Sequence, residues 1–146
     1  AQTTSGIDTL RACTANKASV ILTPHTGELK RLACAADVEN DAESLAKATG
    51  AIVVAKGSTT IISDGAITIA SRYGTSALAK AGTGDVLSGI IGSLVAQGVA
   101  PLLAAELGVY IHSQSGCRAQ QEFGLRSIIA EDLLEQIPSV FKELES

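Results

Sequence analysis

Hydrophobic and polar positions divide the chain into short apolar runs and longer amphipathic segments. Two apolar runs, Ser19–Thr23 and Ala51–Ala55, have the length and composition of buried strands. Farther along, Thr60–Ser63 and Ala66–Ala70 flank the turn dipeptide Asp64-Gly65, which predicts a β-hairpin. The pattern therefore predicts two buried strands followed by a hairpin.

Amphipathic segments with capping residues lie between and after these strands, and we expect them to be helices. The predicted helices are Thr3–Lys17, one beginning at His25–Glu28, one capped by Asn40–Glu43 and ended at Gly50, one from Gly82–Asp85 to Gly98, one from Pro101 towards Phe123-Gly124, and Ser127–Leu144, which we expect to be interrupted at Pro138. Strands followed by loops and helices are typical of a parallel sheet covered by helices. Such sheets bind ligands beyond the carboxyl ends of their strands.

Three loops carry residues suited to phosphate chemistry, and we expect each of them to follow a strand: His25–Glu28, Lys56–Thr60 and Gly82–Asp85. In the third, two glycines allow the backbone to approach a ligand closely. Asp85 lies where an apolar helix begins, and the unpaired N–H groups of a helix start suit a phosphate or a developing anion. Its carboxylate could accept a proton from an attacking hydroxyl. The alternative is a helix-capping aspartate in an ordinary turn.

The other candidate residues also have two interpretations each. Taken alone, His25 is a hydrogen-bonded loop residue more often than a catalyst. Glu28 is either a first-turn carboxylate that favours the helix dipole or a ligand that holds Mg²⁺ through water. Lys56 is either a phosphate contact or a strand-end lysine, and His112, within a predicted helix, is interpreted as structural. The chain lacks the Walker P-loop and the G-x-G-x-x-G dinucleotide motif.

Composition narrows the class of protein further. With 146 residues and 46% hydrophobic residues, the chain is long and apolar enough for a packed core. The net charge of −4 and the lack of a basic stripe argue against nucleic acid as a partner. The longest apolar stretch, Val86–Ala96, is too short to span a bilayer. Three cysteines without metal-ligand spacing predict reduced thiols and a cytoplasmic location.

Several motifs, in one order, resemble the ADP/ATP-dependent NAD(P)H-hydrate dehydratases of the ribokinase-like superfamily. The Gly-Thr-Gly-Asp sequence alone is typical of the superfamily, and the His-x-Gly-Glu sequence with the later segments narrows the resemblance to the dehydratases. The matching segments, all within Val20–Pro138, are Leu22–Glu28, Val54–Gly57, Ala81–Gly92, Gly108–His112 and Ile129–Leu133.

The resemblance implies a three-layer α/β/α fold with a mainly parallel sheet. Domains of this family are nearly twice as long as the chain, and their earlier half has no counterpart before Val20. We therefore expect the chain to be the carboxyl-terminal part of one ribokinase-like domain, which pairs with a missing amino-terminal half or forms a homo-oligomer.

The resemblance also implies a reaction and its ligands. The family repairs NADH and NADPH hydrated at C6 of the nicotinamide ring, using ADP or ATP with Mg²⁺. The C6 hydroxyl is phosphorylated, phosphate then leaves, and the double bond is restored. The sequence alone does not choose between the two donors.

Carried over residue by residue, the resemblance implies Asp85 as the base and a substrate contact, with His25 and Gly27 as further contacts to the hydrated dinucleotide. Glu28 would organise Mg²⁺, directly or through water. The implied nucleotide-binding residues are Lys56, Gly57, Ser58, Thr59, Thr60, Lys80, Ala81, Gly82, Thr83 and Gly84, of which Gly82–Gly84 form the anion hole.

Two departures from the family pattern and two rival functions accompany this interpretation. Thr26 stands where the family usually has proline, and Thr75-Ser76-Ala77 replaces an Asn-Pro-Gly-like run that contacts the nucleotide. One rival is a ribokinase-like kinase of a small hydroxymethyl compound such as a thiamine precursor. The other is a nucleotide-binding module without turnover.

Overall fold

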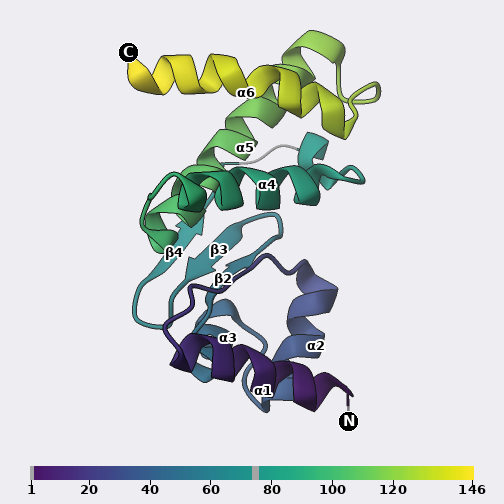
Figure 1. The fold of residues 1–146 in the computed structure, drawn as a ribbon. Coiled ribbons are helices and arrows are strands. Elements are labelled where there is room, and N and C mark those ends of the chain that lie inside the picture. Colours follow the sequence, from purple (N-terminus) through teal and green to yellow (C-terminus); the bar gives the residue numbers. More distant parts are fainter. Residues whose placement is uncertain (1, 74–75) are drawn as a thin grey trace. The chain divides into compact units, whose positions relative to one another are not determined.

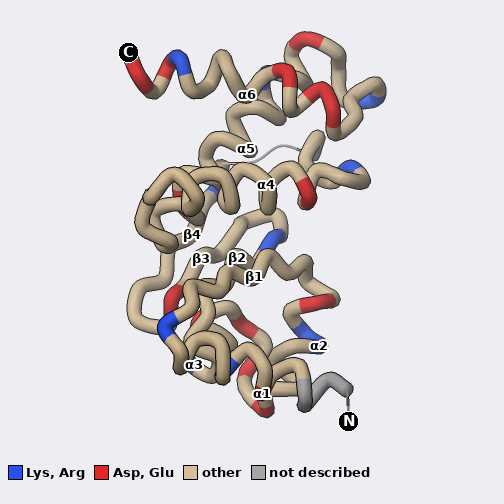
Figure 2. The backbone as a smooth tube through the Cα atoms, viewed as in Figure 1, with Lys and Arg blue, Asp and Glu red and all other residues tan. Residues whose placement is uncertain are grey.

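The computed structural model describes residues 2–73 and 76–146. The described residues divide into two compact units, one up to Ser71 and one from Arg72 onward. Figure 1 shows the sheet in the first unit and a group of helices in the second. Acidic and basic residues occur in both units (Figure 2). No helix among the described residues has the length and hydrophobicity needed to cross a membrane.

The first unit contains a four-stranded mixed sheet. Its strands, in spatial as well as chain order, are β1 (Ile21–Leu22), β2 (Ile52–Ala55), β3 (Thr60–Ser63) and β4 (Thr68–Ser71). β1 and β2 are parallel, with Ile21 opposite Ile52, whereas β2–β3 and β3–β4 are antiparallel. The predicted hairpin is confirmed. The family resemblance implied a mainly parallel sheet. The antiparallel pairs of the hairpin make the sheet of this chain mixed instead.

Three helices complete the first unit: α1 (Gln2–Ala15), α2 (Thr26–Ala36) and α3 (Ala42–Thr49). They gather on one side of the sheet (Figure 1). Ile7, Leu29 and Leu45, one from each helix, pack in one cluster with Val53 of β2. Burying side chains of this size is worth about 1.5–3 kcal/mol each. The apolar positions of the predicted strands and helices therefore form the core of this unit.

Local side-chain chemistry sets the boundaries of these elements. Asp41 caps α3, since its Oδ1 accepts a hydrogen bond of 2.8 Å from the Ser44 backbone N–H. Gly50 ends α3 with φ +72°, and a Cβ there would lie 2.9 Å from the Thr14 hydroxyl oxygen. In the hairpin, Asp64 Oδ1 accepts bonds from the backbone N–H groups of Ala66 (2.9 Å) and Ile67 (2.7 Å). The hairpin and the capped helix thus follow from local sequence.

We expect the carboxylates of Asp41 and Asp64 to make the stability of the protein depend on pH. Hydrogen bonds from the Ser44 N–H to Asp41, and from the Ile67 and Ala66 N–H groups to Asp64, lower the pKa of each carboxyl. Their contribution is fully present above the ordinary aspartate pKa of about 4 and is lost as pH falls through the lowered native pKa values. We therefore expect the unfolding temperature to fall in this acidic range.

The double variant Asp41→Asn/Asp64→Asn tests this dependence, because asparagine keeps the accepting oxygen but does not titrate there. Thermal unfolding followed between pH 6 and pH 3 should show a shallower decline for the variant than for the wild type. Identical declines in the two proteins would contradict the prediction.

The second unit is helical. A short 3₁₀ helix, η1 (Ser76–Ala79), precedes α4 (Thr83–Ala96), α5 (Pro101–Phe123) and α6 (Ala130–Glu145). α5 packs against both α4 and α6, and one shared cluster contains Ile90, Ile111 and Val140. The predicted start of α5 at a proline is confirmed. Proline suits the first helical position because the N–H that it lacks would have no partner within the helix there.

Two expectations for this unit are wrong. α6 runs through Pro138 without interruption. Pro138 cannot donate to the Leu134 carbonyl, but both residues are exposed, so that carbonyl can bind water. In addition, the Gly82–Asp85 loop follows η1 rather than a strand. Of the departing segment Thr75-Ser76-Ala77, Thr75 lies outside the described residues and the other two belong to η1.

Candidate active site

The first two predicted loops lie side by side at the carboxyl end of the parallel strand pair. His25 and Lys56 form an isolated parallel bridge beyond β1 and β2. The Lys56 backbone N–H donates a 2.9 Å hydrogen bond to the Pro24 carbonyl. The structure therefore brings together two sequence segments that the parallel-sheet argument predicted to be neighbours.

His25 and Glu28 close the start of α2 as a reciprocal cap. His25 Nδ1 accepts hydrogen bonds from the backbone N–H groups of Gly27 (3.0 Å) and Glu28 (3.3 Å). Glu28 Oε2 in turn accepts a 2.9 Å bond from the His25 backbone N–H. Because Nδ1 is an acceptor, it carries no proton, which leaves Nε2 as the ring N–H. A Cβ at Gly27 would lie 3.1 Å from His25 Cε1, so the glycine keeps room for the ring.

Glu28 is an ionised acid beside basic groups. The backbone N–H of His25 holds the pKa of the Glu28 carboxyl below its ordinary value, and nearby basic side chains, Lys56 and Arg31 among them, lower it further. An open cavity of about 480 Å³ lies against this acid and is lined by Leu22, Thr23, Pro24, Glu28, Arg31 and Leu32. Arg31 was not among the site residues predicted from the sequence. Its position one helical turn after Glu28 is the signal that could have found it.

The loop between β2 and β3 exposes small residues and their backbone. A Cβ at Gly57 would meet only the Thr59 carbonyl, at an ordinary 3.4 Å, so this chain does not itself require the glycine. Gly57 and Ser58 are exposed, and Lys56 is half-buried. Thr60 already belongs to β3, opposite Ser71. The loop thus offers an ammonium group beside an accessible backbone, as a phosphate contact requires.

The third loop opens α4 in the second unit. Gly82 is the N-cap residue with φ +84°, which favours glycine, and a Cβ there would lie 3.2 Å from Ala130 Cβ. No side-chain hydrogen bond caps this helix. Asp85 is exposed at the third helical position, so the alternative in which it serves as the N-cap does not hold. Its backbone N–H and that of Thr83 make long bonds of 3.2 and 3.3 Å within the turn.

Lys80, Ala81 and Thr83 complete this loop. Lys80 and Ala81 join η1 to α4. The Thr83 side chain is buried, and its hydroxyl lies 2.7 and 2.8 Å from the carbonyl oxygens of Leu78 and Lys80. The hydroxyl of Thr83 therefore holds the loop together.

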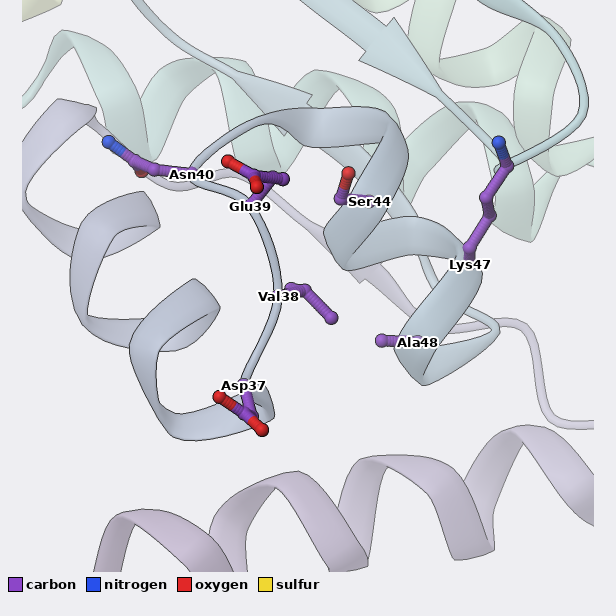
Figure 3. A pocket seen from close by; sticks show the side chains of 7 residues that line it. All are labelled: Asp37, Val38, Glu39, Asn40, Ser44, Lys47 and Ala48. Carbon is purple, nitrogen blue, oxygen red and sulfur yellow. The ribbon is translucent and has the colours of Figure 1, made fainter.

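A larger cavity lies elsewhere in the first unit. It measures about 730 Å³ and is lined by Asp37, Val38, Glu39, Asn40, Ser44, Lys47 and Ala48 (Figure 3). Val38 points towards Ala48 in this view, and Lys47 pairs with Glu43 on its own helix. The lining includes none of the predicted site residues. Among the described residues, no group of three or more His, Cys, Asp or Glu side chains is arranged to hold a metal ion.

The fold is that of ribokinase-like α/β proteins. A ribokinase-like superfamily protein from Enterococcus faecalis superposes with a TM-score of 0.70, covering 92% of this chain and 50% of that one, and its 23% identity shows the fold alone. The family model Carb_kinase, described as NAD(P)H-hydrate dehydratase, matches residues 4–139. The chain belongs to the NAD(P)H-hydrate dehydratase family, and the resemblance inferred from its motifs is confirmed.

Individual relatives agree with this assignment. The chain is 42% identical over 131 residues to the ADP-dependent (S)-NAD(P)H-hydrate dehydratase of Cenarchaeum symbiosum, covering 86% of this chain and 45% of the relative. It is 39% identical over 142 residues to the bifunctional NAD(P)H-hydrate repair enzyme Nnr of Moorella thermoacetica, covering 92% and 27%.

A solved structure agrees as well. The ADP/ATP-dependent NAD(P)H-hydrate dehydratase from Bacillus subtilis, co-crystallized with ATP/Mg²⁺, superposes with a TM-score of 0.77 at 29% identity, covering 86% of this chain and 48% of that one. The chain therefore spans about half or less of the length of the relatives it matches.

Proposed function

We propose that this protein restores hydrated NADH and NADPH by a dehydration that consumes ADP or ATP. The observation that carries the proposal is the family match over residues 4–139, which includes all three predicted loops. The name of the Cenarchaeum relative gives ADP as its donor, and the Bacillus structure was obtained with ATP and Mg²⁺. Both donors are therefore part of the proposal.

In the proposed reaction, Asp85 accepts the proton of the C6 hydroxyl as that oxygen attacks the terminal phosphorus of the nucleotide. The bond from this phosphorus to the leaving nucleotide breaks, and ADP becomes AMP, or ATP becomes ADP. The carbon–oxygen bond at C6 then breaks, phosphate departs with the electron pair, and loss of a ring proton restores the double bond. Phosphoryl transfer asks the protein chiefly for positioning and charge stabilisation.

Each predicted site residue has a role in this proposal. The backbone N–H groups of Gly82–Gly84 stabilise the charge on the transferred phosphoryl group. Lys56–Thr60, Lys80 and Ala81 bind the nucleotide, while His25 and Gly27 contact the hydrated dinucleotide. Support for the His25 role is its ring N–H at Nε2, which the capping bonds at Nδ1 leave as a donor and which lies 3.6 Å from Glu28 Oε2.

Glu28 is proposed to hold Mg²⁺ through water. An ionised, partly exposed carboxylate fits this ion, which keeps several waters and takes few protein carboxylates. When bound, Mg²⁺ would neutralise charge on the phosphates. The capping bond to His25 fixes the Glu28 side chain and so orients the carboxylate for this task.

Lys56→Ala is expected to weaken ADP binding about tenfold or more, because a charge-assisted hydrogen bond to phosphate is worth about 1.5–3 kcal/mol. Isothermal titration calorimetry measures the change. Lys47→Ala is the matched control, since Lys47 pairs with Glu43 on α3 and is not among the proposed contacts. An unchanged dissociation constant for Lys56→Ala would remove this contact from the proposal.

Recovery of NADH absorbance tests the proposed activity and identifies the donor. The protein is incubated with hydrated NADH, Mg²⁺ and either ADP or ATP. Recovery with one donor supports the proposal and selects that donor. Nucleotide binding without recovery with either donor would instead support the module without turnover.

We also propose a cytoplasmic setting and completion of the sheet by further polypeptide. Cys13, Cys34 and Cys117 are free thiols, which favours a reducing compartment.

β1 lies at one edge of the sheet, and an open edge is normally covered. An amino-terminal half of the family domain or a second copy of the chain would cover it. Intact-mass and light-scattering measurements on the native protein distinguish these two partners, and an active species of this chain's mass alone would contradict both.

A further inference from the structure

His112 reaches from α5 to the start of α4. Its imidazole is buried, and Nε2 lies 2.7 Å from the Thr83 carbonyl oxygen. A carbonyl oxygen can only accept, so Nε2 carries the proton and donates this hydrogen bond. Thr83 stands between the N-cap glycine and the Gly84-Asp85 pair. A buried ring that the sequence indicated to be structural thus bonds the backbone of the glycine-rich loop.

Thr83 is held from the other side as well. Its hydroxyl lies within hydrogen-bond distance of the Leu78 and Lys80 carbonyl oxygens, so the side chain is tied back to η1 and the turn that follows. Its carbonyl is tied to α5 through His112. The residue at the centre of the loop is therefore fixed by both its side chain and its backbone.

The packing of α4 against α5 places the ring at this distance. Gly108 lies one helical turn before His112, on the same face of α5. A Cβ at Gly108 would lie 2.4 Å from Ile91 Cγ1, so the two helices approach more closely than an alanine would allow. Close packing at Gly108 holds the middle of α4 against α5, and the hydrogen bond from His112 holds its amino-terminal turn.

We propose that His112 is a positioning residue for the glycine-rich loop. By fixing the Thr83 carbonyl, it fixes the directions of the following N–H groups and the place of the Asp85 carboxylate. The proposal rests on the proposed function of that loop. Groups that stabilise a transition state must be oriented in advance, and a displacement of about 1 Å can cost roughly a hundredfold in rate.

Two substitutions separate positioning from space-filling. His112→Leu keeps an apolar side chain but removes the donor, whereas His112→Gln keeps an N–H donor at similar reach. In the native protein, His112→Leu should lower kcat roughly ten- to hundredfold, with a smaller change in KM for the nucleotide. His112→Gln should restore most of the loss. Equal kcat values for the two variants would overturn the proposal.

Ser113→Ala is the matched control. Ser113 is the next residue of α5, is also buried, and donates a 2.8 Å bond to the Tyr73 carbonyl rather than to the loop. Its kcat should remain within about twofold of the wild-type value, as for a substitution outside the reacting groups. A loss as large as that of His112→Leu would show that general destabilisation of α5 explains both, and would overturn the proposal.

Amide hydrogen exchange gives a readout that does not depend on activity. Exchange at Thr83–Asp85 should be faster in His112→Leu and near wild type in His112→Gln, and unchanged exchange in both would overturn the positioning role. If the wild type lacks dehydratase activity but exchange responds as expected, the proposed function fails while the coupling of His112 to the loop stands. If His112→Leu does not fold, nitrogen NMR of the wild-type ring decides, since a proton on Nδ1 rather than Nε2 would contradict the bond.

Discussion

Asp85→Asn is expected to lower kcat by about a hundred- to ten-thousandfold while the affinity for ADP changes little. The substitution removes the group that accepts the hydroxyl proton, and general-base catalysis is worth about that factor. The loop should keep its shape, because Gly82 is the N-cap and no side-chain hydrogen bond caps α4. Steady-state kinetics gives kcat, and calorimetry gives the dissociation constant of ADP.

Asp132→Asn is the matched control for this substitution. Asp132 occupies the third position of α6, as Asp85 does in α4, and its Oδ2 accepts a 2.8 Å bond from the Ile129 N–H. Asparagine can accept the same bond, so kcat should stay near the wild-type value. Near-wild-type turnover of Asp85→Asn would remove Asp85 from the role of base.

Gly108→Ala is expected to destabilise the protein by about 1–3 kcal/mol, as overpacking of a well-packed interior does. The added Cβ would lie 2.4 Å from Cγ1 of Ile91, which is itself buried. Because Cγ1 lies close to the backbone of α4, relief requires the helices to separate. Urea unfolding followed by circular dichroism measures the loss.

Gly92→Ala, in α4, is expected to have the opposite effect and to stabilise the protein. Gly92 lies within α4 and a Cβ there meets nothing within 4 Å. Alanine should therefore stabilise the helix by up to about 1 kcal/mol. If Gly108→Ala were as stable as Gly92→Ala, the close packing of α4 against α5 would be contradicted.

Local chemistry decided which parts of the fold could be predicted from sequence. The hairpin follows from Asp64-Gly65, and the ends of α3 follow from its cap and Gly50. At the start of β4, a side chain explains why the boundary differs from the prediction. β4 begins at Thr68 rather than Ala66, because Asp64 uses the N–H groups of Ala66 and Ile67 that strand pairing would need.

The candidate site could be predicted only as separate loops. Parallel pairing of β1 and β2 explains why His25 and Lys56 are neighbours. That His25 also caps α2 through Nδ1 depends on a ring orientation that sequence does not specify. The bond from His112 to Thr83 joins residues 29 positions apart and depends on the packing of α4 against α5. Tertiary contacts of this kind leave no local sequence pattern.

A joint count of NADH formed and phosphate released tests the proposed reaction most directly. The protein is given hydrated NADH, Mg²⁺ and ADP or ATP, and both products are measured in the same sample. Our account predicts one phosphate for each NADH, and none without the hydrated substrate. Nucleotide consumption with a phosphorylated product that persists, without NADH or free phosphate, would contradict it in favour of a kinase.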